Sequence, residues 1–150
     1  MGADDDNHEV DSALPSEYRQ DEALRTLANF LRSENGVKQY NAVEHEKRVN
    51  YFKGKHFVEV LLSMGHEMDP KKSKKWPKSI PRITEEHVAV AVGDALLNKN
   101  FFHRSNKEPR GAVKTGDVIL TASSIHKFEN TGYYTWMYQG EMTLRYLMSG

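Results

Sequence analysis

The sequence contains no cysteine, so disulfide bonds, thiolate metal ligands and cysteine nucleophiles are excluded. It also contains no apolar run of about 18 residues, the length that is needed to span a membrane. The first ten residues, MGADDDNHEV, lack the basic and apolar regions of a signal peptide. We therefore expect a soluble chain, and the absence of cysteine is consistent with a reducing compartment.

Sequence signatures of catalysis are absent as well. There is no phosphate-binding glycine loop and no nucleophile elbow, and the seven histidines include no pair at i, i+4 and no zinc-site pattern. His103 lies between aromatic and basic residues, where a structural role fits better than a catalytic one. We therefore predict that the chain is not an enzyme, holds no metal and needs no cofactor.

The charge of the chain is balanced overall but unevenly distributed, since the formal net charge is zero. Residues 1–22 nevertheless carry eight acidic side chains and one basic side chain. A segment of this composition cannot bury enough apolar surface to fold, so we expect an acidic, disordered head over residues 1–22. The overall content of 38% hydrophobic residues suits a single domain with a real core, which we place at residues 23–140.

Apolar residues recur with helical spacing in three places. The first predicted helix runs from a cap at Ser16 towards Gly36, and the second occupies residues 57–64. The third runs from a cap at Thr84 to residues 98–100 and has the most regular apolar stripe of the three. Three amphipathic helices are therefore expected to share one core.

Short runs of β-compatible residues lie between and after these helices. An extended segment at residues 49–52 precedes the second helix, and Gly54 separates the two. After the third helix come FFHR (101–104), DVILTA (117–122) and YYTWMY (133–138). The order of elements predicts an α+β fold that is winged-helix-like, with three helices packed on a small antiparallel β-ribbon.

The expected core lies where the helical stripes meet the ribbon. Phe101 and Phe102 must cover the third helix, so we interpret them as core rather than contact residues. Tyr134, Trp136 and Tyr138 alternate along a strand and are expected to pack inward together. The residues predicted to share one core are Phe57, Leu61, Val88, Val92, Leu96 and Phe102.

Basic residues gather in three groups. The largest is the basic segment, DPKKSKKWPKSIPR at residues 69–82, whose three prolines and lack of periodicity predict a loop. Clustered cations attract carboxylates or phosphates without a unique geometry, although an ordinary solvated surface is the alternative. Trp76 either offers an exposed apolar anchor or folds onto the core. The residues of the three groups are Lys71, Lys72, Lys74, Lys75, Lys78 and Arg82; Lys47, Arg48, Lys53 and Lys55; and Lys99, Arg104, Lys107 and Arg110.

Three blocks of sequence resemble, in the same order, the family of the translocation protein Sec sixty-two. They are RVNYFKGKHFVEVLL (48–62), ALLNKNFFHRSNK (95–107) and YYTWMYQGEMTLRYLM (133–148). The resemblance covers roughly residues 45–150, and no single block is diagnostic without the other two.

The resemblance implies a cytosolic domain of a subunit that lies beside the Sec channel in the endoplasmic reticulum membrane. It implies that residues 141–150 are the juxtamembrane edge of a truncated first transmembrane segment, so that the full-length protein is anchored by C-terminal segments; a frayed or packed terminal helix is the alternative. It also implies a partner, the acidic C-terminal tail of Sec sixty-three, the J-domain subunit, which the basic groups would bind in post-translational import.

Two other functions are weighed against this one. A winged-helix nucleic-acid binder would place the third helix in the major groove, but Glu85, Glu86 and Asp94 would face the phosphates there, so no nucleic acid is expected. Ribosome binding is known in part of the family and is attached there to a basic N-terminus. The N-terminus of this chain is acidic, which argues against that role.

Overall fold

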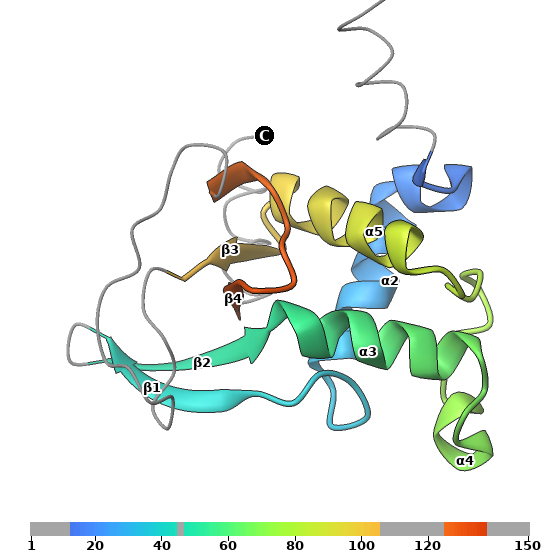
Figure 1. Ribbon diagram of the computed structural model, residues 1–150, viewed down its shortest axis with the longest axis horizontal. Helices are drawn as coiled ribbons and strands as arrows, with labels where there is room; N and C mark the ends of the chain where they lie inside the picture. The colour runs from blue at the N-terminus through green and yellow to red at the C-terminus, as the bar shows by residue number, and fades with distance from the viewer. Residues whose placement is uncertain (1–12, 45–46, 106–124, 138–150) are drawn as a thin grey trace, which may run out of the picture.

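The computed structural model describes residues 13–44, 47–105 and 125–137, and the α+β class is confirmed (Figure 1). Within those ranges, no helix is both long enough and apolar enough to cross a membrane. The elements in chain order are η1 (Ser16–Arg19), α2 (Asp21–Arg32), β1 (Tyr40–Glu44), β2 (Lys47–Lys53), α3 (Gly54–Gly65), α4 (Pro70–Ser73), α5 (Glu86–Asn98), β3 (Phe102–Arg104) and β4 (Tyr133–Trp136).

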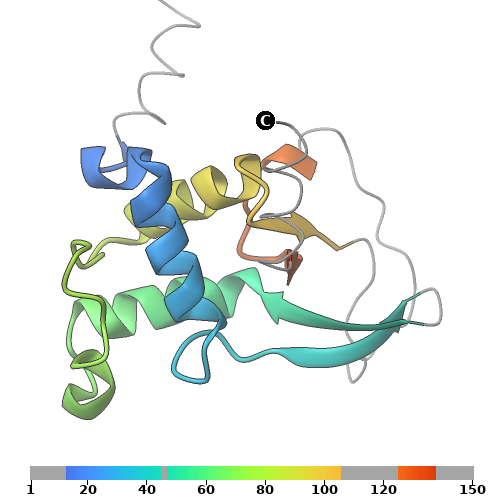
Figure 2. The same ribbon diagram turned by 180° about the vertical axis from the view of Figure 1, so that it is seen from behind.

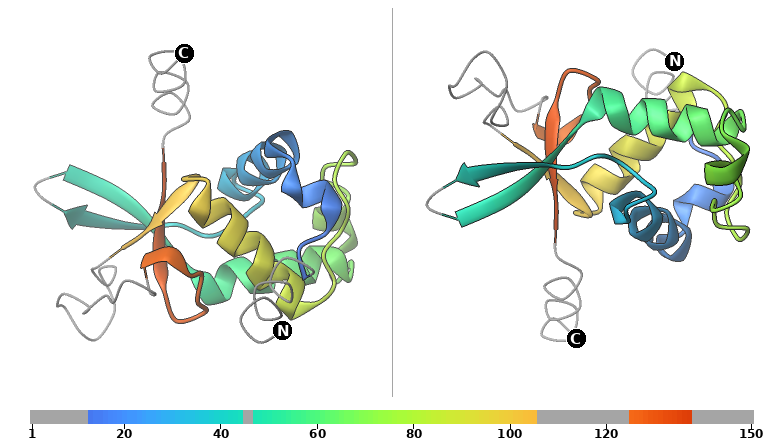
Figure 3. Two further views of the ribbon diagram at one scale, coloured as in Figure 1. Left: turned by 90° about the horizontal axis from the view of Figure 1, so that it is seen from above. Right: turned by 90° about the horizontal axis from the view of Figure 1, so that it is seen from below.

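The four strands form one antiparallel sheet in the order β1-β2-β4-β3. The central pair is fixed by Phe52 opposite Tyr134, and β3 joins at the edge with Phe102 opposite Trp136. Strands β1 and β2 extend away from the helices, as both views of Figure 3 show. The helices therefore cover only the part of the sheet where β2, β3 and β4 meet.

The predicted order of helix, strand, two helices and ribbon agrees with the observed order, whereas the winged-helix assignment itself stays a prediction. Strand β1 was not predicted, although it pairs with β2 from Tyr40 opposite Tyr51 to Glu44 opposite Lys47. Its sequence, YNAVE, has a single β-branched residue and no strict alternation, so only pairing with β2 identifies it. The predicted strand at residues 117–122 lies outside the described residues.

Two predicted helix starts are wrong. Ser16 begins the short 3-10 helix η1, and the α-helix α2 begins only at Asp21. Likewise, Glu85 rather than Thr84 occupies the N-cap position of α5, and it makes no side-chain capping hydrogen bond. Ser16 and Thr84 both lie shortly before an α-helix, but neither occupies its N-cap position, because tertiary packing determines where each helix begins.

The folded chain also begins before the predicted boundary at residue 23. Tyr18 in η1 is completely buried, and its hydroxyl donates a hydrogen bond to the carbonyl oxygen of Pro81. Burial raises the pKa of this phenol, with a smaller contribution from Glu17. One aromatic anchor thus draws residues 16–19 onto the domain despite the acidic composition around it.

An aromatic cluster forms the centre of the core and joins the sheet to the helices. The ring of Phe52 on β2 stacks on Trp136 at 4.8 Å between centroids and meets Phe102 edge-on at 5.2 Å. Phe128 stacks on Tyr134 at 4.9 Å. The predicted core is confirmed: five of its six residues are fully buried, and Val88 is partly buried against them. Tyr138 lies outside the described residues.

Two glycines allow backbones to approach closely at the ends of α3. Gly54 begins the helix, and a Cβ there would lie 2.3 Å from the carbonyl oxygen of Glu129. Gly65 ends the helix, and a Cβ there would lie 1.8 Å from the carbonyl oxygen of Ile83. Since both obstacles are backbone atoms, only glycine fits without moving the chain.

We predict that Gly65→Ala destabilises the domain even though alanine is the better helix former. The helix-propensity gain of about 1 kcal/mol is smaller than the cost of overpacking, so the free energy of unfolding should fall by about 1–2 kcal/mol. Urea unfolding measures this change. Ser63→Ala, in the same helix, should stay within about 0.5 kcal/mol of the parent protein. A Gly65→Ala variant as stable as the parent would contradict the packing described above.

Candidate functional site

The basic segment, residues 69–82, contains the short helix α4 (Pro70–Ser73), and the residues after it form turns and irregular structure, as the sequence predicts. Asp69 caps α4, because its Oδ1 accepts hydrogen bonds from the backbone N–H groups of Lys71 at 3.1 Å and Lys72 at 3.4 Å. Trp76 is 4% exposed, packs edge-on against Phe30, and donates from Nε1 to the carbonyl oxygen of Ile80 at 3.0 Å. The indole is therefore part of the core and not an apolar anchor for a partner.

Arg82 holds the two ends of this segment together. Its Nη1 donates to the carbonyl oxygen of Met64 at 2.6 Å, and its Nη2 donates to the carbonyl oxygen of Ser73 at 2.9 Å. The guanidinium also lies 3.5 Å from a carboxylate oxygen of Glu67. Most of its donors are thus engaged within the protein. Arg82 positions α4, while its side chain remains 32% exposed.

The five lysines of the segment remain at the surface. Lys71, Lys72, Lys74, Lys75 and Lys78 are all exposed. The first two lie on α4 and the other three on the residues that follow it, at the end of α3 that is far from the sheet (Figure 1). Lys75 donates from Nζ to Oδ1 of Asn35 at 3.1 Å. This contact joins the basic segment to the turn that follows α2.

The second basic group lies at the opposite end of α3. Lys53 and Lys55 flank the junction of β2 with α3, and both are exposed. The ammonium groups of Lys53 and Lys38 each lie 5.3 Å from the ring centroid of Tyr40. Lys38 was missed in the sequence because it stands alone, and only the fold brings it beside Lys53. Such cation–π contacts hold lysine side chains in place while leaving their charge accessible.

The remaining residues of the second group are Lys47 and Arg48 on β2. Lys47 is opposite Glu44 in the register of the two strands, and Arg48 is opposite Val43. These positions lie in the part of the β1–β2 ribbon that extends away from the helices (Figure 2). They are therefore farther along the sheet than Lys53 from the end that meets α3.

A groove of about 450 Å³ lies between these two basic groups. One wall is the turn after α2, which includes Glu34 and Lys38, and the other is the outer face of α3. Val60 and Met64 contribute apolar surface from α3, and Lys72 closes the end next to α4. Residues that are distant in the sequence thus border one depression.

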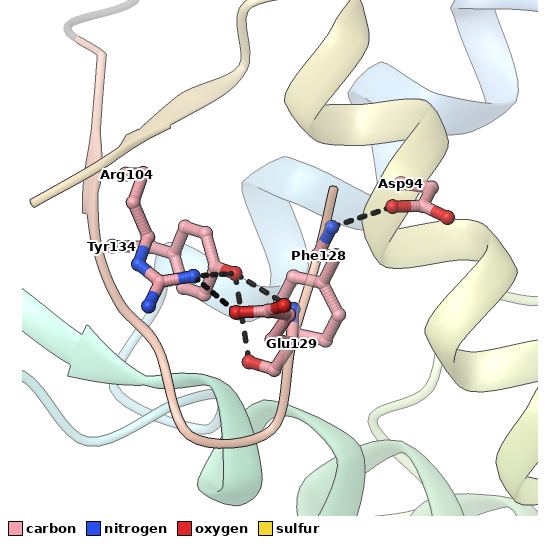
Figure 4. A network of polar contacts seen from close by, with 5 residues as sticks. All are labelled: Asp94, Arg104, Phe128, Glu129 and Tyr134. Carbon is pink, nitrogen blue, oxygen red and sulfur yellow. Dashed lines mark hydrogen bonds and ion pairs between the residues drawn. The ribbon is translucent and has the colours of Figure 1, made fainter. Parts of the chain in front are cut away.

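Two residues of the third basic group, Lys99 and Arg104, lie in the described part of the chain. The side chain of Arg104 is 8% exposed, and its Nη1 lies 2.9 Å from Glu129 Oε2 and 3.5 Å from the Tyr134 hydroxyl (Figure 4). Arg104 therefore does not offer the exposed charge that the sequence predicts, because its guanidinium is buried against the partly exposed carboxylate of Glu129. Lys99 pairs with Asp21 at the start of α2. Lys107 and Arg110 lie outside the described residues.

The same network ties α5 to the segment that precedes β4. Asp94 Oδ1 accepts a hydrogen bond of 2.6 Å from the backbone N–H of Phe128 (Figure 4). Burial raises the pKa of this carboxyl above its ordinary value of 3.8, and the hydrogen bond from Phe128 and the charge of Lys127 oppose the rise. Burial likewise raises the pKa of Tyr134, whose hydroxyl accepts from the N–H of Glu129 at 2.8 Å. Asp94 and Tyr134 therefore make their hydrogen bonds within the protein, whereas the lysines are exposed at the surface.

The acidic residues of α5 divide into two kinds. Glu85 and Glu86 are exposed at its start, and Glu86 accepts a hydrogen bond from Asn130 at 3.2 Å. Asp94, which the sequence analysis counts with the charges facing outward, is half-buried, and its Oδ1 accepts a hydrogen bond from the N–H of Phe128. No group of three or more potential metal ligands occurs in the described part of the chain.

Comparison with known proteins gives two similar relatives, while no protein-family model matches the chain. The translocation protein Sec sixty-two of Schizosaccharomyces pombe is 30% identical over 113 residues, which is 75% of this chain and 39% of the relative. The translocation protein Sec sixty-two of Kluyveromyces lactis is 26% identical over 128 residues, which is 81% of this chain and 51% of the relative. The chain thus spans about half, or less, of the length of the curated relatives it matches.

We predict that Asp94→Asn makes the domain more stable at neutral pH. A carboxyl with a raised pKa in the folded state stabilises the fold below its unfolded value of 3.8, and this contribution is lost as the pH rises through the folded value. Asparagine keeps the acceptor for Phe128 without the buried charge. The gain should therefore grow from about pH 3 towards neutrality, as measured by urea unfolding across pH.

The control for this prediction is Asp94→Ala, which removes the acceptor together with the charge. It should be less stable than Asp94→Asn by about 1–3 kcal/mol at every pH, because both variants lose the titrating carboxyl but only alanine leaves the N–H of Phe128 unsatisfied. A gain for Asp94→Asn that does not change with pH would show that the raised pKa is not its cause.

Proposed function

The chain belongs to the Sec sixty-two family of translocation proteins, and we propose that it is the cytosolic docking domain of a protein-translocation subunit of the endoplasmic reticulum. In this proposal the domain binds the acidic C-terminal tail of Sec sixty-three during post-translational import. The protein then acts with the Sec channel complex, and no enzymatic activity is required. Family membership supports the pathway, and the exposed lysines support the mode of binding.

The observation that carries the proposal is the set of five exposed lysines held on a fixed scaffold. Lys71, Lys72, Lys74, Lys75 and Lys78 protrude from a segment that the Asp69 cap, the buried Trp76 and the hydrogen bonds of Arg82 keep in place. Lysines anchored in this way attract carboxylates without the cost of ordering a loop first. Lys53 and Lys55 extend the surface to the other end of α3.

The proposal also places the domain at the endoplasmic reticulum membrane, facing the cytosol. It holds that residues 141–150, which lie outside the described residues, lead into a first transmembrane segment, and that the full-length protein is anchored beyond them. In this proposal the acidic, disordered head is shorter than residues 1–22, because Tyr18 is buried in the domain.

Nucleic-acid binding is the alternative from another class, and the distribution of charge argues against it. Glu85 and Glu86 lie at the start of α5, where a DNA-reading helix would approach phosphates, and both are exposed. The lysines are concentrated instead on α4 and the residues that follow it. Residues 1–22, with eight acidic side chains and one basic side chain, argue against a ribosome-binding role for this segment.

We predict that replacing Lys71, Lys72, Lys74 and Lys75 by glutamate weakens binding to an acidic tail peptide by about tenfold or more. Each exposed ion pair contributes about 0.2–1 kcal/mol, so the four must act together. Binding should also weaken between about 0.1 M and about 1 M salt, because the screening length shortens from about 10 Å to about 3 Å. Fluorescence anisotropy of a labelled peptide from the acidic C-terminus of Sec sixty-three measures both effects.

The matched control replaces the same four lysines by arginine, which keeps the charge and should keep the affinity. Circular dichroism checks that both variants fold. Titration with duplex DNA at the same ionic strength tests the alternative function. Salt-independent peptide binding, or micromolar affinity for the DNA with none for the peptide, would overturn the proposal.

A further inference from the structure

We infer that the groove beside α3 holds an extended segment of the acidic partner, in which acidic residues at both ends flank an uncharged, apolar centre. This inference rests on the proposed function and adds to it a sequence pattern that the partner must have. It follows from three features of the groove: the positions of its cations, its length, and the character of its central part.

The cations of the groove stand at its two ends. At the sheet end, Lys38 lines the groove, and Tyr40 holds Lys53 close to it, since both ammonium groups contact the same ring. At the far end, Lys72 lines the groove, and Lys75 reaches across to Asn35 in the turn after α2. A bound segment therefore meets positive charge where it enters and where it leaves.

The length of the groove follows from the part of α3 that lines it. The lining residues of α3 begin at His56 and end at Met64. With a rise of about 1.5 Å per residue, these eight steps span about 12 Å along the helix. An extended chain covers this distance with about four residues, at about 3.3 Å for each residue. The site thus accommodates a short extended segment, and a bound helix of the same number of residues would cover only half of it.

The central part of the groove suits an uncharged occupant. Val60, midway along this stretch of α3, offers half-buried apolar surface, and Ser63 nearly one turn further has a small side chain. Glu59, next to Val60, also borders the groove and would repel a carboxylate placed there. Glu34 borders it beside Asn35, at the end where Lys72 and Lys75 lie. Glu59 lies 3.7 Å from His56, which offsets part of its charge when the imidazole is protonated. Acidic residues are favoured at the ends and disfavoured in the middle.

Two peptides of identical composition test the inference on the 150-residue chain. The first contains Asp-Asp-Leu-Leu-Asp-Asp between glycine-serine flanks, and the second contains Leu-Asp-Asp-Asp-Asp-Leu between the same flanks. The first should bind about tenfold more tightly, because only its leucines reach the apolar centre while its carboxylates meet the lysines at both ends. Fluorescence anisotropy at one ionic strength gives both dissociation constants.

Two variants of the protein locate the effect in the groove. Ser63→Phe fills the space beside Val60 and should reduce the preference between the peptides to about onefold, with overall charge unchanged. Lys38→Glu, at an exposed position, should weaken the first peptide about fivefold. Arg25→Glu is the control of equal charge change on the outer surface of α2 and should leave both affinities unchanged. Circular dichroism shows whether each variant folds. If the Ser63 variant does not fold, unchanged binding of the first peptide by Lys38→Glu would overturn the groove inference.

The outcomes separate this inference from the proposed function. If the parent protein binds both peptides equally, and the four-lysine reversal abolishes both, the proposed function stands and the groove inference is overturned. If neither peptide binds, the proposed function fails and the groove inference fails with it. A preference for the first peptide that survives Ser63→Phe, in a folded variant, also overturns the groove inference.

Discussion

The direct passage of β2 into α3 is the constraint on which the rest of the structure depends. Lys53 ends the strand and Gly54 begins the helix, so no loop separates them. The N–H of Gly54 donates to the carbonyl oxygen of Gly132 at 2.8 Å, which ties the junction to the turn before β4. Phe52 on one side of the junction and Phe57 on the other then reach the same aromatic cluster. The direction of α3 relative to the sheet is thereby fixed.

This fixed direction also sets the surface. Since α3 begins at the sheet and ends next to α4, the lysines at its two ends are separated by the length of the helix (Figure 1). A polar network also ties α5 to the segment before β4. Asp94 on α5 accepts a hydrogen bond from Phe128, and Arg104 pairs with Glu129 beside Tyr134 (Figure 4). Their charges are used within the protein, so they fix the core without competing for a partner.

The sequence predicted what depends on local periodicity. The apolar stripes of α3 and α5, the aromatic alternation of Tyr134 and Trp136, and the α+β class all follow from spacing along the chain, and the structure confirms them. Strand β1 and the true starts of α2 and α5 did not follow, because pairing and packing with distant residues determine them.

The candidate site was harder to predict for the same reason. Charge counting found the exposed lysines of the basic segment, but it counted Arg82 and Arg104 with them, although both bind groups within the protein. It missed Lys38, which becomes relevant only beside Tyr40 and Lys53. A count of charges records which side chains carry charge, whereas their partners and their exposure depend on the fold.

A net charge of zero is compatible with the docking of an acidic partner that we propose. At physiological ionic strength, electrostatic interactions are screened over about 8 Å, so a carboxylate responds to the lysines nearest to it and not to the net charge. The two ends of the groove are about 12 Å apart by the rise of α3, which is longer than this screening distance. In the proposed complex, each end would therefore act on its own carboxylate. Two separate charge contacts would define the position of the bound segment, which a single continuous basic patch would leave free to slide.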